Sequence, residues 1–138
     1  MSTIENKAIV RRLVEEAQSA GNISLVDELL SSDFIDHTPL PGFSPTREGI
    51  KALFTALRVA FPNLHVTIQE QIAEDQKVMT RKTFSGTHGG EFLGVPASNR
   101  QVEFEVIDIM SVVDNQITDH RVIVDNLSLM QQLGAIPS

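Results

Sequence analysis

Hydrophobic residues in the first part of the chain recur every three or four positions, which predicts helices. The opening segment places apolar side chains on one helical face, at Ile9, Val10, Leu13, Val14 and Ala17. Ser2, followed three residues later by Glu5, predicts a capping box at the start of this helix. Gly21 predicts its end.

Two further helices follow before residue 62. Asn22 can cap a short second helix, whose apolar stripe consists of Leu25, Val26, Leu29 and Leu30. Thr46 can cap a third helix that ends near Phe61 and Pro62. The intervening segment 31–45 holds three prolines and one glycine and is predicted to be a loop.

After Pro62 the hydrophobic period changes from about four residues to two, which predicts strands. The first two predicted strands cover residues 64–69 and 78–85, with a hairpin turn at 74–76. Residues 87–99 contain three glycines and a proline and are predicted to form a loop.

Two longer strands are predicted at 101–113 and 116–124, followed by a last helix. The two residues Asp114 and Asn115 join these strands and require antiparallel pairing. The last helix begins after Asp125 or Asn126 and ends at Gly134. Helices first and hairpin-linked strands afterwards predict an α+β fold, with residues 1–138 as one domain.

Composition removes several functional classes. The 138 residues contain no cysteine, which excludes disulfides and thiolate metal sites and suits a cytoplasmic location. The net charge of −7 and the absence of Lys/Arg clusters disfavour nucleic acid and anionic membranes as partners. We expect no signal peptide and no membrane span.

The strand 101–113 has two different faces. One face is apolar except for a single carboxylate, and comprises Val102, Phe104, Val106, Asp108, Met110 and Val112. Because this face must meet the helices, Asp108 should lie within or beside the core. An enclosed carboxylate is suited to acid–base chemistry, but a structural aspartate tied to amides or to an arginine is an equal alternative.

The opposite face of the same strand ends in Ile107, Ile109 and Val113. Such an apolar patch on a sheet needs cover, and a second subunit is the simplest one. The sequence therefore predicts a homodimer or homotetramer.

The strand 116–124 brings a histidine into the same region. His120 shares its parity with Val122 and Val124, so it points inward if these valines do. Asp36 and His37 are weaker candidates, because they can equally make turn contacts. The four histidines have no metal-ligand spacing, and no metal is predicted.

Several short segments, in this order and spacing, resemble the SnoaL-like polyketide cyclases of the nuclear transport factor two-like superfamily. They are Phe34-Ile-Asp-His37, Phe61-Pro-Asn-Leu64, Gly86-Thr-His88, Glu91-Phe-Leu-Gly-Val-Pro96, Asp119-His-Arg121 and Leu129-Met-Gln-Gln-Leu-Gly134. The resemblance extends from residue 6 to residue 134. It implies a cone-shaped α+β barrel, with the helices packed on a curved, mostly antiparallel sheet around a pocket.

The resemblance also implies a chemistry: ring closure by an intramolecular aldol step, with acid–base groups and without metal or cofactor. The catalytic carboxylate of the family directly follows the Asp-His-Arg run, where this chain has Val122. The family's pocket histidine corresponds to Asp108, and Asp36 falls where the family carries a polar pocket residue. His120 and Arg121 match the family.

Three functions follow as alternatives. In the first, a cofactor-independent cyclase or isomerase-type lyase acts on a small hydrophobic carbonyl compound: Asp108 abstracts a proton and His120 polarises the oxygen. The predicted ligand-binding residues are Asp36, His37, Phe54, Phe104, Met110 and Val122. The second is a non-catalytic binder of an apolar metabolite, which Val122 favours. The third is an assembly module with a filled pocket.

Overall fold

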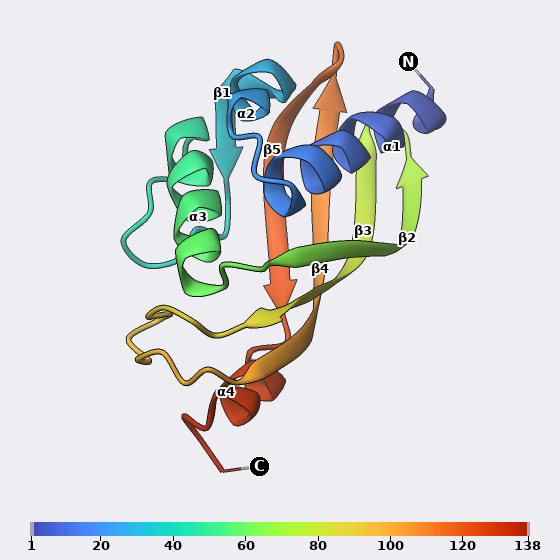
Figure 1. Ribbon diagram of the computed structural model, residues 1–138. Helices are drawn as coiled ribbons and strands as arrows, with labels where there is room; N and C mark the ends of the chain where they lie inside the picture. The colour runs from blue at the N-terminus through green and yellow to red at the C-terminus, as the bar shows by residue number, and fades with distance from the viewer. Residues whose placement is uncertain (1, 138) are drawn as a thin grey trace.

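The structure is a computed structural model, and it describes residues 2–137. Its elements are α1 (Thr3–Arg12), η1 (Leu13–Ser19), α2 (Ser24–Leu29), β1 (Leu30–Asp36), α3 (Arg47–Ala60), β2 (His65–Glu74), β3 (Lys77–Thr87), β4 (Gln101–Val113), β5 (Gln116–Val124) and α4 (Asn126–Leu133). The strands form one curved, open sheet in the order β1-β5-β4-β3-β2 (Figure 1). β1 pairs in parallel with β5 and the other pairs are antiparallel, which confirms the predicted α+β class.

The first helix begins as predicted and changes its winding midway. Ser2 and Glu5 form the capping box. From Leu13 to Ser19 the chain is a π-helix, η1, and beyond it the Ala20 amide donates to the Glu15 carbonyl at 3.1 Å. A π turn inside a helix often marks a functional position. Here η1 buries both Leu13 and Gln18.

The segment 31–45, predicted to be a loop, contains the strand β1, so that prediction is wrong for its first part. β1 is an edge strand whose register with β5 shifts between Leu30 and Ile35. Its polar run Ser31 to Asp33 breaks the alternation by which strands are recognised. The strand is held by long-range parallel pairing, which local pattern does not reveal.

The two hairpins agree with the predicted ones, and the long strands β4 and β5 have the predicted bounds. Asp114 and Asn115 have φ angles of 50° and 65°. Two successive left-handed residues give the type I′ turn that matches strand twist. This turn fixes which residues of β4 and β5 face the helices.

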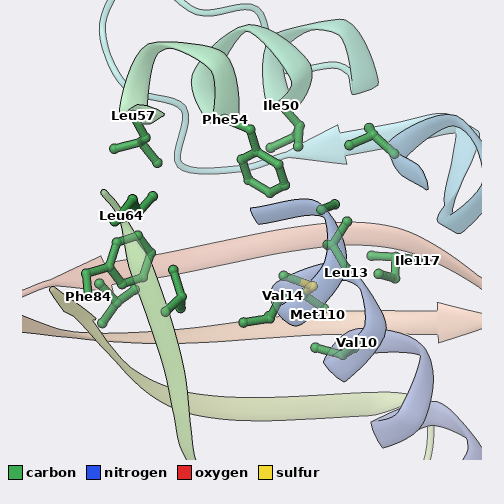
Figure 2. Packing of buried hydrophobic residues seen from close by; sticks show 14 of the residues in the cluster. Val10, Leu13, Val14, Ile50, Phe54, Leu57, Leu64, Phe84, Met110 and Ile117 are labelled. Carbon is green, nitrogen blue, oxygen red and sulfur yellow. The ribbon is translucent and has the colours of Figure 1, made fainter. Parts of the chain in front are cut away.

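The core lies between the sheet and the helices (Figure 2). The labelled residues come from α1 and η1, from α3, from the sheet and, for Leu64, from the residue just before β2: Val10, Leu13, Val14, Ile50, Phe54, Leu57, Leu64, Phe84, Met110 and Ile117. Burial of each large apolar side chain contributes about 1.5–3 kcal/mol relative to exposure. The inner parity of β4 is buried from Val102 to Val112, with Asp108 among it, as the alternation predicts.

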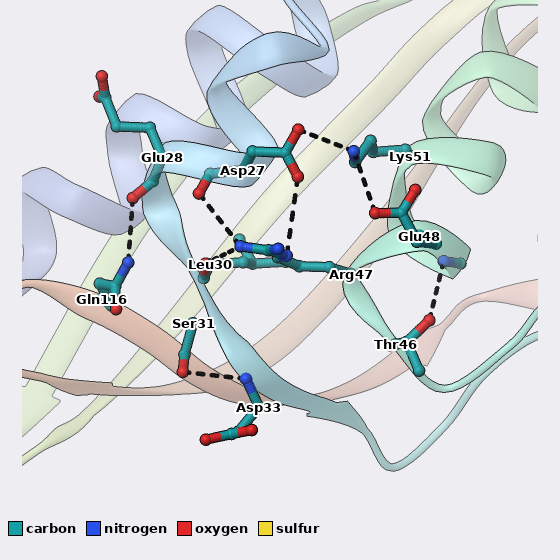
Figure 3. Close-up of polar contacts among 11 residues, drawn as sticks. Asp27, Glu28, Leu30, Ser31, Asp33, Thr46, Arg47, Glu48, Lys51 and Gln116 are labelled. Atoms are coloured by element: carbon teal, nitrogen blue, oxygen red, sulfur yellow. Dashed lines mark hydrogen bonds and ion pairs between the residues drawn. The ribbon is translucent and has the colours of Figure 1, made fainter.

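Polar contacts hold α3 against the start of β1 (Figure 3). Thr46 caps α3 as predicted by accepting from the Gly49 amide. Arg47 donates to the carbonyls of Asp27 and Leu30 at 3.3 and 3.4 Å. These contacts fix the helix whose inner side roofs the cavity described below.

The chain ends with α4, which packs against β4 near the lower end of the sheet in Figure 1. Asp125 caps it, and Gly134 closes it with a φ of 76°, as predicted. Between residues 2 and 137 no helix is both long and apolar enough to cross a membrane.

The outer face of the sheet carries exposed apolar residues on several neighbouring strands. Ile107 is 40% exposed, Ile123 76%, Met79 39% and Ile72 60%. Ile107 and Ile123 are direct partners across β4 and β5. The apolar outer patch predicted from the sequence is present in part, because Ile107 is exposed whereas Ile109 and Val113 are half-buried.

Candidate functional site

A cavity lies between the inner face of the sheet and the helices. The cavity volume is about 90 Å³, and one water needs roughly 10–15 Å³. The cavity therefore has room for several waters or a small organic group. Its wall is mainly apolar, and its charged or titratable members are Asp36, Lys82 and His120.

Asp36 and His120 form a pair in the cavity wall. They are register partners in the parallel pairing of β1 with β5. His120 Nδ1 lies 3.2 Å from Asp36 Oδ1, and the two residues are 9% and 5% exposed. The edge strand that sequence patterns missed thus supplies the carboxylate beside the histidine.

Asp36 is held in its ionised form by hydrogen bonds. Burial by itself raises the pKa of the Asp36 carboxyl, but hydrogen bonds from His120 and from the Thr38 amide outweigh burial and lower the pKa below its ordinary value. The Thr38 amide donates to Oδ1 at 3.0 Å. Asp36 is therefore a carboxylate at neutral pH.

This charge state determines the arrangement of protons on His120. An ionised carboxylate can only accept, so Nδ1 of His120 must be the donor in their hydrogen bond. In a neutral imidazole the lone pair is then on Nε2. His120 lines the cavity, and its side-chain hydrogen bond within residues 2–137 is the one made through Nδ1. Nε2 is therefore the ring nitrogen that remains for a molecule in the cavity.

A second charged pair joins the neighbouring strands β3 and β4. Lys82 Nζ is 2.7 Å from Asp108 Oδ2, and the side chains are 3% and 0% exposed. Lys82 also donates to Gln18 Oε1 at 2.9 Å. Within residues 2–137 neither Asp108 oxygen accepts an aligned hydrogen bond, so the Lys82 contact is an ion pair by distance and charge.

The two pairs form one oblique polar row across the inner face. The register places Met110 opposite His120, Asp108 opposite Val122, and Lys82 opposite Val106. Asp108 is thus a diagonal neighbour of both His120 and Lys82. Its carboxylate is directed to Lys82, while His120 is directed to Asp36.

The cavity wall brings together most of the residues predicted to bind ligand. It contains Asp36, Phe54, Phe104, Met110, Val122 and the predicted catalytic residue His120. Asp108 is buried behind Lys82 and is not part of the wall. His37 also lies outside the wall, and its Nε2 is 3.5 Å from Asp119 Oδ2.

Three polar residues of this region were not found from the sequence. Lys82 and Gln18 lie in the wall, and Thr38 supports Asp36. Lys82 shares its strand parity with Val78 and Phe84, which are buried, and this was the signal that marks it as inward. Gln18 had no signal, because its position depends on the π-helical turn.

A metal centre finds no support among residues 2–137, where no group of three or more His, Asp or Glu side chains is arranged to hold an ion.

Comparison with known proteins agrees with the α+β fold. An aklanonic acid methyl ester cyclase, DnrD of Streptomyces peucetius, is 31% identical over 129 residues, covering 91% of this chain and 88% of its own. The nogalonic acid methyl ester cyclase of Streptomyces nogalater is 26% identical, covering 86% and 90%. The structure of TsrD from Streptomyces laurentii superposes with a TM-score of 0.89 at 27% identity, covering 99% of each chain.

The architecture is that of the cone-like α+β domains of the nuclear transport factor two-like superfamily. Residues 8–133 match the family model of the SnoaL-like polyketide cyclases. The chain belongs to this family, and the resemblance inferred from its short segments is confirmed.

Proposed function

We propose that this protein is a cofactor-independent cyclase or isomerase for a small, mostly hydrophobic carbonyl compound, with His120 and Asp36 as its acid–base pair. Two related chains are cyclases of polyketide methyl esters, which supports a ring-closing reaction. The observation that carries the proposal is the buried hydrogen bond between Asp36 and His120 in the cavity wall.

The proposed reaction moves one proton out and back. His120 Nε2 takes a proton from a carbon next to a carbonyl group, leaving an enolate and an imidazolium that Asp36 stabilises. The enolate carbon attacks a second carbonyl carbon, so that one carbon–carbon bond forms and an alkoxide results. The imidazolium returns its proton to the alkoxide, and the histidine is neutral again.

Asp36 suits the role of partner to His120 better than Asp108 does. Asp108 is in contact with Lys82 at 2.7 Å and lies outside the cavity wall. A base must reach the proton that it removes. We therefore assign proton transfer to His120, with Asp36 as its positioning residue, and leave Asp108 as the counter-ion of Lys82.

Deuterium exchange tests this proposal without knowledge of the natural substrate. Ethyl benzoylacetate, an aromatic β-keto ester, exchanges its C2 hydrogens slowly in neutral D₂O, and NMR follows the exchange. We expect the native protein to accelerate exchange and His120→Gln to lose the acceleration. Acceleration that is equal in His120→Gln and the native protein contradicts the assignment.

The alternative function, binding without reaction, is favoured by one observation. Val122 lines the cavity at the position where the resemblance puts the family's carboxylate. A binder predicts that ethyl benzoylacetate stabilises the protein against heat and is recovered with its C2 hydrogens unexchanged beyond the rate of buffer. The same NMR experiment therefore separates the two functions.

The proposal includes a homodimer that covers the outer face of the sheet. Ile107 and Ile123 form an exposed apolar pair there, and Met79 extends the patch onto β3. A second copy of the same face is the simplest cover for such a surface, because two-fold contacts are self-complementary.

A further inference from the structure

Lys82 is a charged side chain in a mainly apolar wall, and the acid–base pair does not use it. It projects from the inner parity of β3 and is 3% exposed. A buried ammonium is costly unless it is paired and hydrogen-bonded. Its position in the wall calls for a role toward whatever occupies the cavity.

The donor count of Lys82 leaves one N–H for a ligand. An ammonium group has three N–H donors and no acceptor. One is taken by the Gln18 amide oxygen at 2.9 Å, and one faces the Asp108 carboxylate at 2.7 Å. The third has no acceptor among residues 2–137, and Lys82 and Gln18 both belong to the cavity wall.

Asp108 is the counter-ion that a buried Lys82 ammonium needs, with 2.7 Å between Oδ2 and Nζ. An ammonium has no lone pair, so in this state Lys82 cannot attack a carbonyl carbon to form an imine. It can donate to a carbonyl or enolate oxygen and stabilise the negative charge there.

An aromatic ring defines the rest of the subsite. Nζ of Lys82 lies 5.5 Å from the centre of the Phe84 ring, and Phe84 also lines the cavity. The rings of Phe84 and Phe104 lie 5.3 Å apart between their centres and are tilted by 33°. A flat conjugated ligand packed on these rings would bring an oxygen substituent to Lys82.

We propose that Lys82 is the oxyanion-binding residue of the cavity, and that it donates to the oxygen of a ligand bound there as its enolate. This inference rests on the proposed function, since His120 would remove the proton whose charge Lys82 receives.

The spacing of the two groups fits one small molecule. In the sheet, Lys82 lies two strands away from His120 and four residues further along the strand direction. Their backbones are therefore separated by roughly 10 Å across the sheet and roughly 13 Å along it. The Lys82 side chain shortens this gap, because it extends toward Asp108, which is two residues nearer to His120 in register. A dicarbonyl unit attached to a ring can span what remains.

The test uses benzoylacetone, 1-phenylbutane-1,3-dione, whose enolate has its own ultraviolet absorption band. The band is followed against pH with the native protein, Lys82→Met and Lys77→Met. Lys77 is the matched control, because it lies on the same strand and is exposed. We expect native protein and Lys77→Met to lower the pH of half-ionisation of the bound diketone by about one unit, a tenfold preference for the enolate.

Lys82→Met should lose this shift. The Lys82→Met/Asp108→Leu double variant, which removes both charges together, provides the same reading if the single variant does not fold. An unshifted diketone in the native protein, or an equal shift in the Lys82 variants, overturns the proposal. An absorption band of a conjugated enaminone, formed by loss of water between lysine and diketone, also overturns it, because Lys82 would then act as a nucleophile.

The pH of half-ionisation of the bound diketone does not depend on how fast His120 transfers a proton. His120→Gln should keep the shift, because it leaves Lys82 and Asp108 in place. A shift that is present while deuterium exchange is not accelerated would therefore sustain the Lys82 subsite and refute the acid–base function.

Discussion

Asp36 and His120 lie opposite each other in the parallel pairing of β1 and β5, with 3.2 Å between Oδ1 and Nδ1. The pairing joins an edge strand from the first third of the chain to β5, which is the last strand in the sequence. It places a carboxylate behind an imidazole in an apolar wall, the arrangement that orients histidine bases in other enzymes.

Replacing the carboxylate tests its part in catalysis. Asp36→Asn should slow exchange of ethyl benzoylacetate by about 10²–10⁴-fold, because the amide no longer fixes the proton on Nδ1 of His120. Asp33→Asn, on an exposed position of the same strand, should leave the rate unchanged. Equal rates for Asp36→Asn and the native protein would remove Asp36 from the mechanism.

Acid stability should reveal the same carboxylate. The pKa of Asp36 lies below its ordinary value in the folded protein, so its ionised form stabilises the fold above the unfolded-state pKa. That contribution is lost as pH falls from the ordinary pKa through the lowered one. Urea unfolding of Asp36→Asn should therefore show a weaker loss of stability in this acidic range. Parallel stability curves for variant and native protein would contradict the hydrogen-bonding account.

The Lys82 and Asp108 pair gives a prediction about free energy. Lys82→Met should destabilise the fold by about 3–5 kcal/mol, because it leaves the Asp108 carboxylate buried without its counter-ion. Lys82→Met/Asp108→Leu should be closer to the native protein, since both charges are removed together. Denaturant unfolding of Lys82→Met, Asp108→Leu and the double variant measures these free energies. Additive losses would show that the pair is not coupled.

Val122 provides a test of whether the family's carboxylate position still matters. Val122→Asp should destabilise the fold by about 1–3 kcal/mol, because the new carboxylate enters the cavity wall opposite Asp108. We expect no gain in exchange rate, since proton transfer is assigned to His120. A gain of tenfold or more would indicate that the cavity is a cyclase site lacking only its acid.

The outer face has its own test. Ile109→Lys, on the outward parity of β4 beside Met79, should dissociate the proposed dimer or make the protein insoluble. Thr83→Lys, on the outward parity of β3 nearer its end, is the control. Analytical ultracentrifugation measures both. A native protein that sediments as a monomer refutes the dimer outright.

The fold was largely predictable because its signals are local. Alternation along β4 and β5 set their bounds and faces, and capping residues set the starts of α1, α3 and α4. The predicted cap of α2 is wrong, because its N-cap is Ile23, which makes no side-chain capping bond, and not Asn22. The strand β1 was missed because its alternation is broken and its pairing joins positions more than eighty residues apart, as Asp36 and His120 do.

For the site, strand parity predicted only which side chains face the interior of the protein. Parity placed His120 and Asp108 on the inner face, and both are buried there. It did not indicate which partner each would find. Asp108 meets Lys82 and His120 meets Asp36, because side-chain length and the parallel edge pairing decide the contacts.

The measurement closest to the central claim is the tautomer of His120, read from the nitrogen chemical shifts of ¹⁵N-labelled protein at neutral pH. The account predicts a proton on Nδ1, donated to Asp36, and a bare Nε2, with this preference lost in Asp36→Asn. A neutral ring protonated on Nε2 instead would turn its lone pair toward Asp36 and leave the cavity without a base.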